Sequence, residues 1–208
     1  MPVTINASTS SGLISSADTS GTIELQSNGT TKLTVSSSGV NIGQMNGGAI
    51  TSGTAVASTS GTSIDFTGIP SWVKRITIML NGVSTGGTSN YIVQISSGAG
   101  SLNTGYASSC AYAGGVNQAA GATQTGGFVI LNEVLTTTAA AGTVTLNLFG
   151  NNTWISNGTL MYNSTTPSAF TATSTGVRAL GGTLDRVRIT SVSSDTFDAG
   201  SINILYEG

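Results

Sequence analysis

The sequence predicts an all-β protein in which an N-terminal extended or hairpin segment precedes a jelly-roll-like β-sandwich. Short Val/Ile/Leu-rich runs alternate with polar residues along most of the chain, which is the period of half-buried strands. Turn residues separate these runs, and 29 glycines are spread over the 208 residues. No stretch has a convincing helical period, so the elements are expected to be strands throughout.

The N-terminal part, residues 1–45, is predicted to contain a hairpin. Two alternating runs, 22–26 and 31–35, flank Asn28-Gly29, and Asn-Gly is the strongest short signal for a hairpin turn. The apolar residues of this part should share one face: Ile23, Leu25, Leu33, Val35, Val40 and Ile42. Because an isolated hairpin is marginally stable, this face is expected to pack on the sandwich, on other copies of the chain or on a larger scaffold.

A change of character near residue 62 predicts a domain boundary. Residues 46–62 have the Gly/Ser/Thr composition of a linker or of a loosely packed extended segment, and no aromatic residue precedes Phe66. Residues 63–208 then form the predicted sandwich, because about ten short strands at regular spacing are typical of that architecture. Its expected strands are 63–69, 72–83, 90–97, 104–113, 126–134, 142–149, 152–162, 168–178, 183–193 and 196–207. Residues 114–125 are expected to form a mobile loop.

The chain carries very little ionisable chemistry. It has no His and one Cys, and only 7% of its residues are charged, with a net charge of −2. His-dependent triads and zinc sites are therefore excluded, and no catalytic residue, cofactor or metal is expected. The weak net charge argues against nucleic-acid partners, and the absence of a long apolar stretch argues against membrane insertion. The chain also begins without the basic and apolar regions of a signal peptide.

Four aromatic or cationic residues are candidates for contact with a glycan. Trp72 and Trp154 are each interpreted first as packing residues and second as platforms on which a sugar ring could stack. Arg186 and Arg188 should share one face of their strand, where they could pair with Asp65, Asp185, Asp195 or Glu207, or contact an anionic glycan. Cys110 is expected to be an inert core thiol, with Tyr106 and Tyr112 on its face of the strand.

The acidic residues support few chemical hypotheses. Asp185, Asp195 and Asp198 lack the spacing of a known calcium loop, and Asp195 and Asp198 are expected to set a turn. A glycan depolymerase would need two carboxylates on either side of a glycosidic bond, with Glu133 and Asp185 as the residues to test.

Three stretches resemble segments of structural proteins from tailed bacteriophages, especially marine and cyanobacterial ones. Residues 17–35, ADTSGTIELQSNGTTKLTV, resemble a segment common in such proteins. Residues 64–77, IDFTGIPSWVKRIT, resemble the opening of a β domain of phage fibre and virion-surface proteins. GTLDRVRIT (182–190) and DTFDAGSINI (195–204) are similar to the close of that domain.

The resemblance implies a virion component, commonly a homotrimer, with an N-terminal attachment segment and a distal knob. Its partners would be copies of itself, other capsid or tail proteins and a host-surface glycan, and it would be made in the host cytoplasm and displayed on the virion surface. The chain is short for a long tail fibre and lacks heptad repeats, which favours a compact decoration, such as a capsid decoration or head fibre, or a terminal module held by another protein. A tail fibre or tail-tip receptor-binding adhesin is the alternative, and a glycan depolymerase is the third hypothesis.

Overall fold

A computed structural model describes residues 22–37, 39–42, 50–98, 100, 102–114, 118–132, 134, 136–163 and 169–208. The described residues form strands, turns and loops, so the predicted all-β class is confirmed. The chain divides into two compact units, Met1–Asn46 and Gly47–Gly208. The described part of the chain contains no helix with the length and apolarity needed to cross a membrane.

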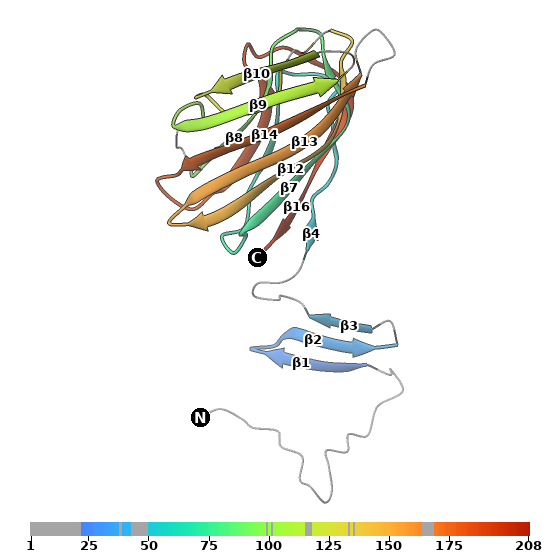
Figure 1. Cartoon of the computed structure of the whole chain (residues 1–208). Helices are drawn as coiled ribbons and strands as arrows, with labels where there is room; N and C mark the ends of the chain where they lie inside the picture. Colours follow the sequence, from blue (N-terminus) through green and yellow to red (C-terminus); the bar gives the residue numbers. More distant parts are fainter. Residues whose placement is uncertain are drawn as a thin grey trace, which may run out of the picture. The chain divides into compact units, whose positions relative to one another are not determined.

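The smaller unit is a three-stranded antiparallel sheet (Figure 1). Its strands are β1 (Ile23–Ser27), β2 (Thr30–Ser36) and β3 (Gly39–Ile42), with β2 in the centre. Asn28 and Gly29 connect β1 to β2 with φ angles of 52° and 72°. Positive φ at both central residues defines the type I′ turn that matches strand twist, so the predicted Asn-Gly hairpin is confirmed.

The larger unit is a sandwich of two antiparallel sheets. Figure 1 shows the long strands of the larger sheet one beside the next, in the order β10-β9-β14-β13-β12-β7-β16-β4. These strands are β10 (Gln118–Gln124), β9 (Tyr106–Gly114), β14 (Ala169–Ala179), β13 (Thr153–Asn163), β12 (Ala139–Gly150), β7 (Arg75–Thr85), β16 (Phe197–Glu207) and β4 (Thr51–Ser52), and β5 (Val56–Ala57) also pairs with β16. The smaller sheet has the order β11-β8-β15-β6: β11 (Phe128–Leu131), β8 (Tyr91–Ser96), β15 (Arg186–Ser191) and β6 (Ser63–Thr67).

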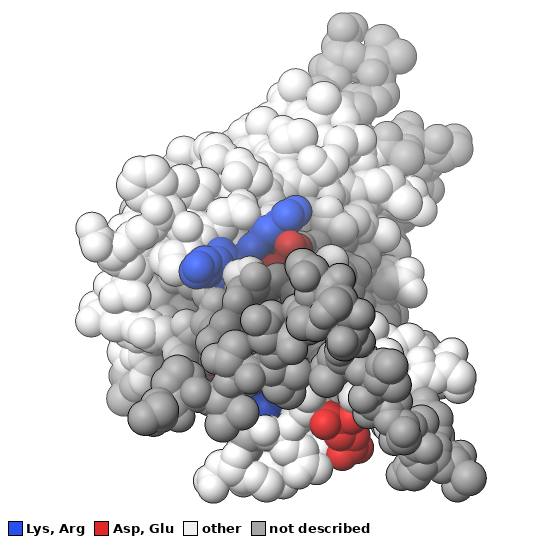
Figure 2. All heavy atoms as spheres, turned by 90° about the horizontal axis from the view of Figure 1, so that it is seen from below, with Lys and Arg blue, Asp and Glu red and all other residues white. Residues whose placement is uncertain are grey.

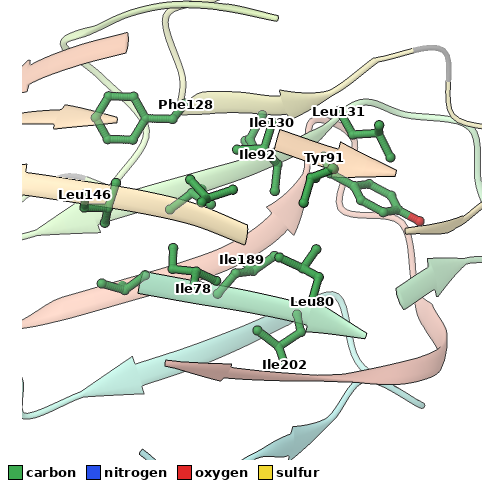
Figure 3. Packing of buried hydrophobic residues seen from close by; sticks show 14 of the residues in the cluster. Ile78, Leu80, Tyr91, Ile92, Phe128, Ile130, Leu131, Leu146, Ile189 and Ile202 are labelled. Carbon is green, nitrogen blue, oxygen red and sulfur yellow. The ribbon is translucent and has the colours of Figure 1, made fainter. Parts of the chain in front are cut away.

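One continuous apolar core joins the two sheets. Ile78, Leu80 and Leu146 come from the nine-stranded sheet, and Ile130 and Ile189 from the four-stranded sheet. All five are at most 4% exposed and belong to the same cluster in Figure 3. Alternating strands produce this core because every second side chain points to the same face.

A buried polar group of residues also connects the sheets. The Tyr106 hydroxyl accepts a hydrogen bond from the backbone N–H of Ile95 (2.7 Å), and it lies 2.9 Å from the carbonyl oxygen of Leu102. Arg178, which is 6% exposed, donates to the Ile95 carbonyl and to the Tyr106 hydroxyl. Its guanidinium carbon also lies 4.2 Å from the centre of the Tyr106 ring. These contacts join β9 and β14 to β8 and to the loop before β9.

The structure differs from the sequence-based expectation in two segments. Residues 46–62 were expected to be a linker or a loosely packed extended segment, but β4 and β5 within this range are strands that pair with β16. Residues 114–125 were expected to be a mobile loop, but 118–124 form β10 on β9. Strands β4, β5 and β10 consist mostly of small or polar residues and lie at the edges of the nine-stranded sheet, where a strand gains main-chain hydrogen bonds without burying large side chains.

Glycine at position 200 is required by the backbone of β16. Gly200 has φ of +93°, and an added Cβ would lie 2.5 Å from the Gly82 carbonyl oxygen. We expect Gly200→Ala to lower the free energy of unfolding by about 3 kcal/mol, because it combines a strained φ with a backbone clash. Urea denaturation measures this change. Gly181→Ala is the matched control, since Gly181 has no atom within 4 Å of an added Cβ, and its effect should stay within about 0.5 kcal/mol. An equal loss in both variants would contradict the expectation.

Candidate functional site

The N-terminal sheet presents an apolar face built from two cross-strand rows. Ile23 lies opposite Val35, which lies opposite Val40, and Leu25, Leu33 and Ile42 are aligned in the same way. Ile23, Leu25 and Val40 are 54%, 50% and 62% exposed, which is unusual for three neighbouring large apolar side chains. The strand register therefore confirms the prediction that the six apolar residues of this sheet share one face.

The opposite face of this sheet is polar. Gln26 and Thr31 both donate hydrogen bonds to the carboxylate of Glu24, at 3.2 and 3.0 Å. Polar side chains of the polar face therefore form hydrogen bonds with one another. The apolar face offers only apolar contact. Such an arrangement can attach the chain to an apolar surface but supplies no chemistry for a reaction.

A second candidate site lies on the outer face of the four-stranded sheet. We call it the small-sheet cavity: a space of about 410 Å³ lined by Thr62, Ser63, Ile92, Gln94, Leu102, Asn103, Arg188, Thr190, Ser191, Val192 and Ser194. It is formed where alternate residues of β15 and β8 point away from the core and the loop before β9 folds over them. Its volume is in the range of ordinary small-molecule sites.

Of the four predicted glycan-contacting residues, the two tryptophans do not lie in this cavity. Trp154 is 2% exposed and lies in the core, which confirms its first interpretation as a packing residue and contradicts the second, a sugar-stacking platform. The turn-flanked strand suggested exposure, but Trp154 falls on the inward face of β13, on the same side as the 1%-exposed Ser156. Trp72 lies in a turn before β7, with its ring partly buried and edge-on to Tyr206 at 6.3 Å. Its packing role is therefore the one that the structure supports.

Arg186 and Arg188 share the outer face of β15, as predicted. Arg188 lies opposite Asp65 of β6 and Gln94 of β8, and Arg186 lies opposite Thr67 and Ser96. The Arg188 guanidinium donates two hydrogen bonds to Asp65, from Nε to Oδ1 at 2.9 Å and from an Nη to Oδ2 at 3.0 Å. Of the four acids expected as partners, Asp65 is thus the one that pairs with Arg188.

Sequence reasoning missed the polar neighbours of Arg188 that complete the cavity. Thr190 continues the alternation of Arg186 and Arg188 on β15, so that signal was present in the sequence. Gln94 and Ser191 carried no local signal, because their positions in the cavity depend on strand pairing and on the fold of the chain around them.

Asp195 and Asp198 make structural hydrogen bonds, whereas one side-chain oxygen of the partly buried Asp185 has no hydrogen-bond partner within the described part of the chain. Asp195 accepts a hydrogen bond from the Ser89 N–H at 2.9 Å, and its own N–H donates to Ser191 Oγ at 2.7 Å, which fits the expected turn. Asp198 accepts a hydrogen bond from Ser84 Oγ. Among the described residues no group of three or more His, Cys, Asp or Glu side chains is placed to hold a metal ion. Glu133, one of the two acids of the depolymerase hypothesis, lies outside the described residues.

Charge is sparse on the surface. Figure 2 shows one face of the molecule on which acidic and basic side chains form small spots and most of the described surface is neutral. Within the described residues, two ion pairs account for four charged side chains: Arg188 with Asp65, and Arg75 with Glu207 at 3.6 Å. The described surface therefore offers mainly neutral hydrogen-bonding groups and shape to any partner.

Cys110 is a buried thiol, as predicted. It is 3% exposed, and its Sγ lies 3.4 Å from Asn132 Oδ1. Burial raises the thiol pKa from 9.0 to about 11, and a hydrogen bond with the backbone of Asn132 opposes part of that shift. At neutral pH the thiol is therefore protonated and poorly nucleophilic. Tyr106 is also buried, while Tyr112 is partly buried and packs against the core, which confirms the shared face.

Comparison with known proteins found no relative. The chain matches no protein-family model, no curated protein and no solved structure.

The raised pKa of Cys110 predicts a loss of stability at alkaline pH. The unfolded chain releases the thiol proton near pH 9 and the folded chain near pH 11, so the free energy of unfolding falls as the pH rises between these values. From pH 8.5 to 11 the unmodified protein should lose about 2 kcal/mol more than Cys110→Ala. Urea denaturation at both pH values measures the difference. Burial also raises the pKa of Tyr91 and Tyr106, and this contribution is common to both proteins. Identical pH dependence in the two proteins would contradict the prediction.

Proposed function

We propose that this protein is a structural component of a tailed-phage virion, a short homotrimeric fibre or capsid-surface decoration. In this proposal the N-terminal sheet attaches the chain to the particle, and the jelly-roll-like β-sandwich projects from it. The observation that carries the proposal is the apolar face of the N-terminal sheet, on which Ile23, Leu25 and Val40 are half or more exposed. The phage-like stretches in both units support the same assignment.

Self-association is the arrangement that fits this face best. A three-stranded sheet with one apolar side is too small to form a core alone, whereas three copies around an axis can bury that side against one another. The other face already satisfies its polar groups through Glu24, so it has no comparable need for a partner. A closed trimer would also protect sheet edges that a single chain leaves open.

The native mass tests the trimer directly. Multi-angle light scattering on the full chain at micromolar concentration should give three times the chain mass of 20.7 kDa. A mass equal to one chain would overturn the homotrimer.

Substitutions on alternate residues of β2 test which face carries the association. Leu33→Lys and Val35→Lys each place a charge on the apolar face, and we expect both to shift the native mass to that of a single chain. Thr34→Lys is the matched control, because Thr34 lies between them in sequence and opposite Glu24 in the register. It should leave the mass unchanged. The sandwich should stay folded in all three variants, as judged by its thermal unfolding. Loss of the trimer in Thr34→Lys alone would contradict the assignment of the apolar face.

Location on the particle tests the virion assignment. Immunogold electron microscopy on purified virions, with an antibody against residues 63–208, should label particle surfaces. Label on the heads is the expected result for a decoration or head fibre. Label confined to the tails would favour the tail-fibre or tail-tip adhesin instead, and the absence of label and of the chain itself from purified particles would overturn the virion assignment.

A further inference from the structure

The small-sheet cavity has polar side chains that are fixed before any ligand arrives. Gln94, Thr190 and Ser191 line it and are 7%, 6% and 2% exposed. The Gln94 side-chain amide donates to the Gly126 carbonyl oxygen at 2.9 Å, and Thr190 Oγ1 donates to the Thr62 carbonyl oxygen at 2.6 Å. Because these bonds orient both side chains, a ligand would not have to order them on binding.

These fixed groups still have hydrogen-bonding capacity. A side-chain amide has two N–H donors and an acceptor oxygen, and a hydroxyl that donates its single proton keeps two acceptor lone pairs. Ser63 and Ser194 add two further hydroxyls to the lining. The cavity therefore offers closely spaced neutral donors and acceptors, which suit a ligand whose own groups both donate and accept.

Arg188 lines the cavity, and its charge is balanced by Asp65 on the neighbouring strand β6. Its Nε and one Nη bind the two oxygens of Asp65, so the pair carries no net charge. The second Nη of the guanidinium is left to donate elsewhere, in a plane fixed by the bidentate pair. An anionic ligand would face the Asp65 carboxylate beside this donor, whereas an uncharged hydroxyl can accept from it without repulsion.

Apolar side chains complete the lining. Ile92, Leu102 and Val192 lie among the polar residues of the cavity. A ligand that fits must therefore present carbon-bound hydrogens as well as hydroxyls. A pyranose ring does so, with hydroxyls around its edge and C–H groups on its faces.

We propose that the small-sheet cavity is a binding site for an uncharged saccharide unit, held by Gln94, Thr190 and the Arg188–Asp65 pair. This inference goes beyond the proposed virion role and does not depend on it, because it rests on the sandwich alone. It also differs from a contact through the tryptophans, neither of which lines the cavity.

Saturation-transfer difference NMR on the full chain tests the site. The probes are the methyl glycosides of glucose, galactose and mannose, with those of glucuronic acid and N-acetylneuraminic acid as anionic comparisons, all at millimolar concentration. We expect saturation transfer to at least one neutral glycoside and none to the anionic ones. Thr190→Val removes one hydroxyl without changing the shape of the side chain and should weaken binding about five-fold.

Two further variants make the result decisive. Arg188→Met combined with Asp65→Asn removes the partly exposed ion pair without leaving a charge unpaired, so the fold should persist while neutral-sugar binding is lost. Thr173→Val is the matched control, because Thr173 is an exposed threonine of the nine-stranded sheet outside the cavity, and it should bind as the unmodified protein does. The proposal is overturned if no neutral glycoside binds, if only the anionic glycosides bind, or if Thr190→Val and the double variant bind as strongly as Thr173→Val.

Discussion

The contact between Tyr106 and Arg178 is the interaction on which the geometry of the sandwich end beside the cavity depends. A buried guanidinium is costly unless its donors find acceptors, and here one Nη donates to the Ile95 carbonyl, the Leu102 carbonyl and the Tyr106 hydroxyl, while the Tyr106 ring lies against the guanidinium carbon. Ile95 belongs to the small sheet and Leu102 to the loop that lines the cavity. The same bonds that stabilise the buried charge therefore fix the small sheet, the large sheet and this loop relative to one another.

The scarcity of charge explains how the two faces of each sheet differ. Along β14 and β13, inward positions hold apolar residues such as Ala172 and Leu160, while outward positions hold Thr173 and Thr159, which lie side by side in the register. When a partner covers such a surface, the hydroxyls lose contact with water. The desolvation cost is then smaller than it would be for charged side chains at the same positions. A protein built in this way can bury its surface in an assembly, or against an uncharged ligand, with little electrostatic penalty.

Much of the fold could be predicted from the sequence because its signals are local. The Asn28-Gly29 turn and the ten alternating runs after residue 62 each fall on observed strands and turns, within a few residues at their ends. The prediction missed strands in which polar and apolar side chains do not alternate clearly, namely β4, β5 and β10. Main-chain pairing at a sheet edge determines where these strands lie. For Trp154 the sequence left packing and sugar stacking both open, because the flanking turns do not reveal which face of a strand is inward.

The cavity could be predicted only in part, because strand order brings together lining residues that are far apart in the sequence. Arg188 was identifiable as an outward cation of β15, but its surroundings come from Asp65, Gln94 and Leu102, which lie 123, 94 and 86 positions away in sequence. No local pattern links residues that only strand order brings together. The N-terminal sheet is the opposite case. Its apolar face can be predicted from the alternation of residues alone, but the alternation does not identify the partner of that face. The two proposals made above thus concern different units: attachment is proposed for the smaller unit and saccharide binding for the larger.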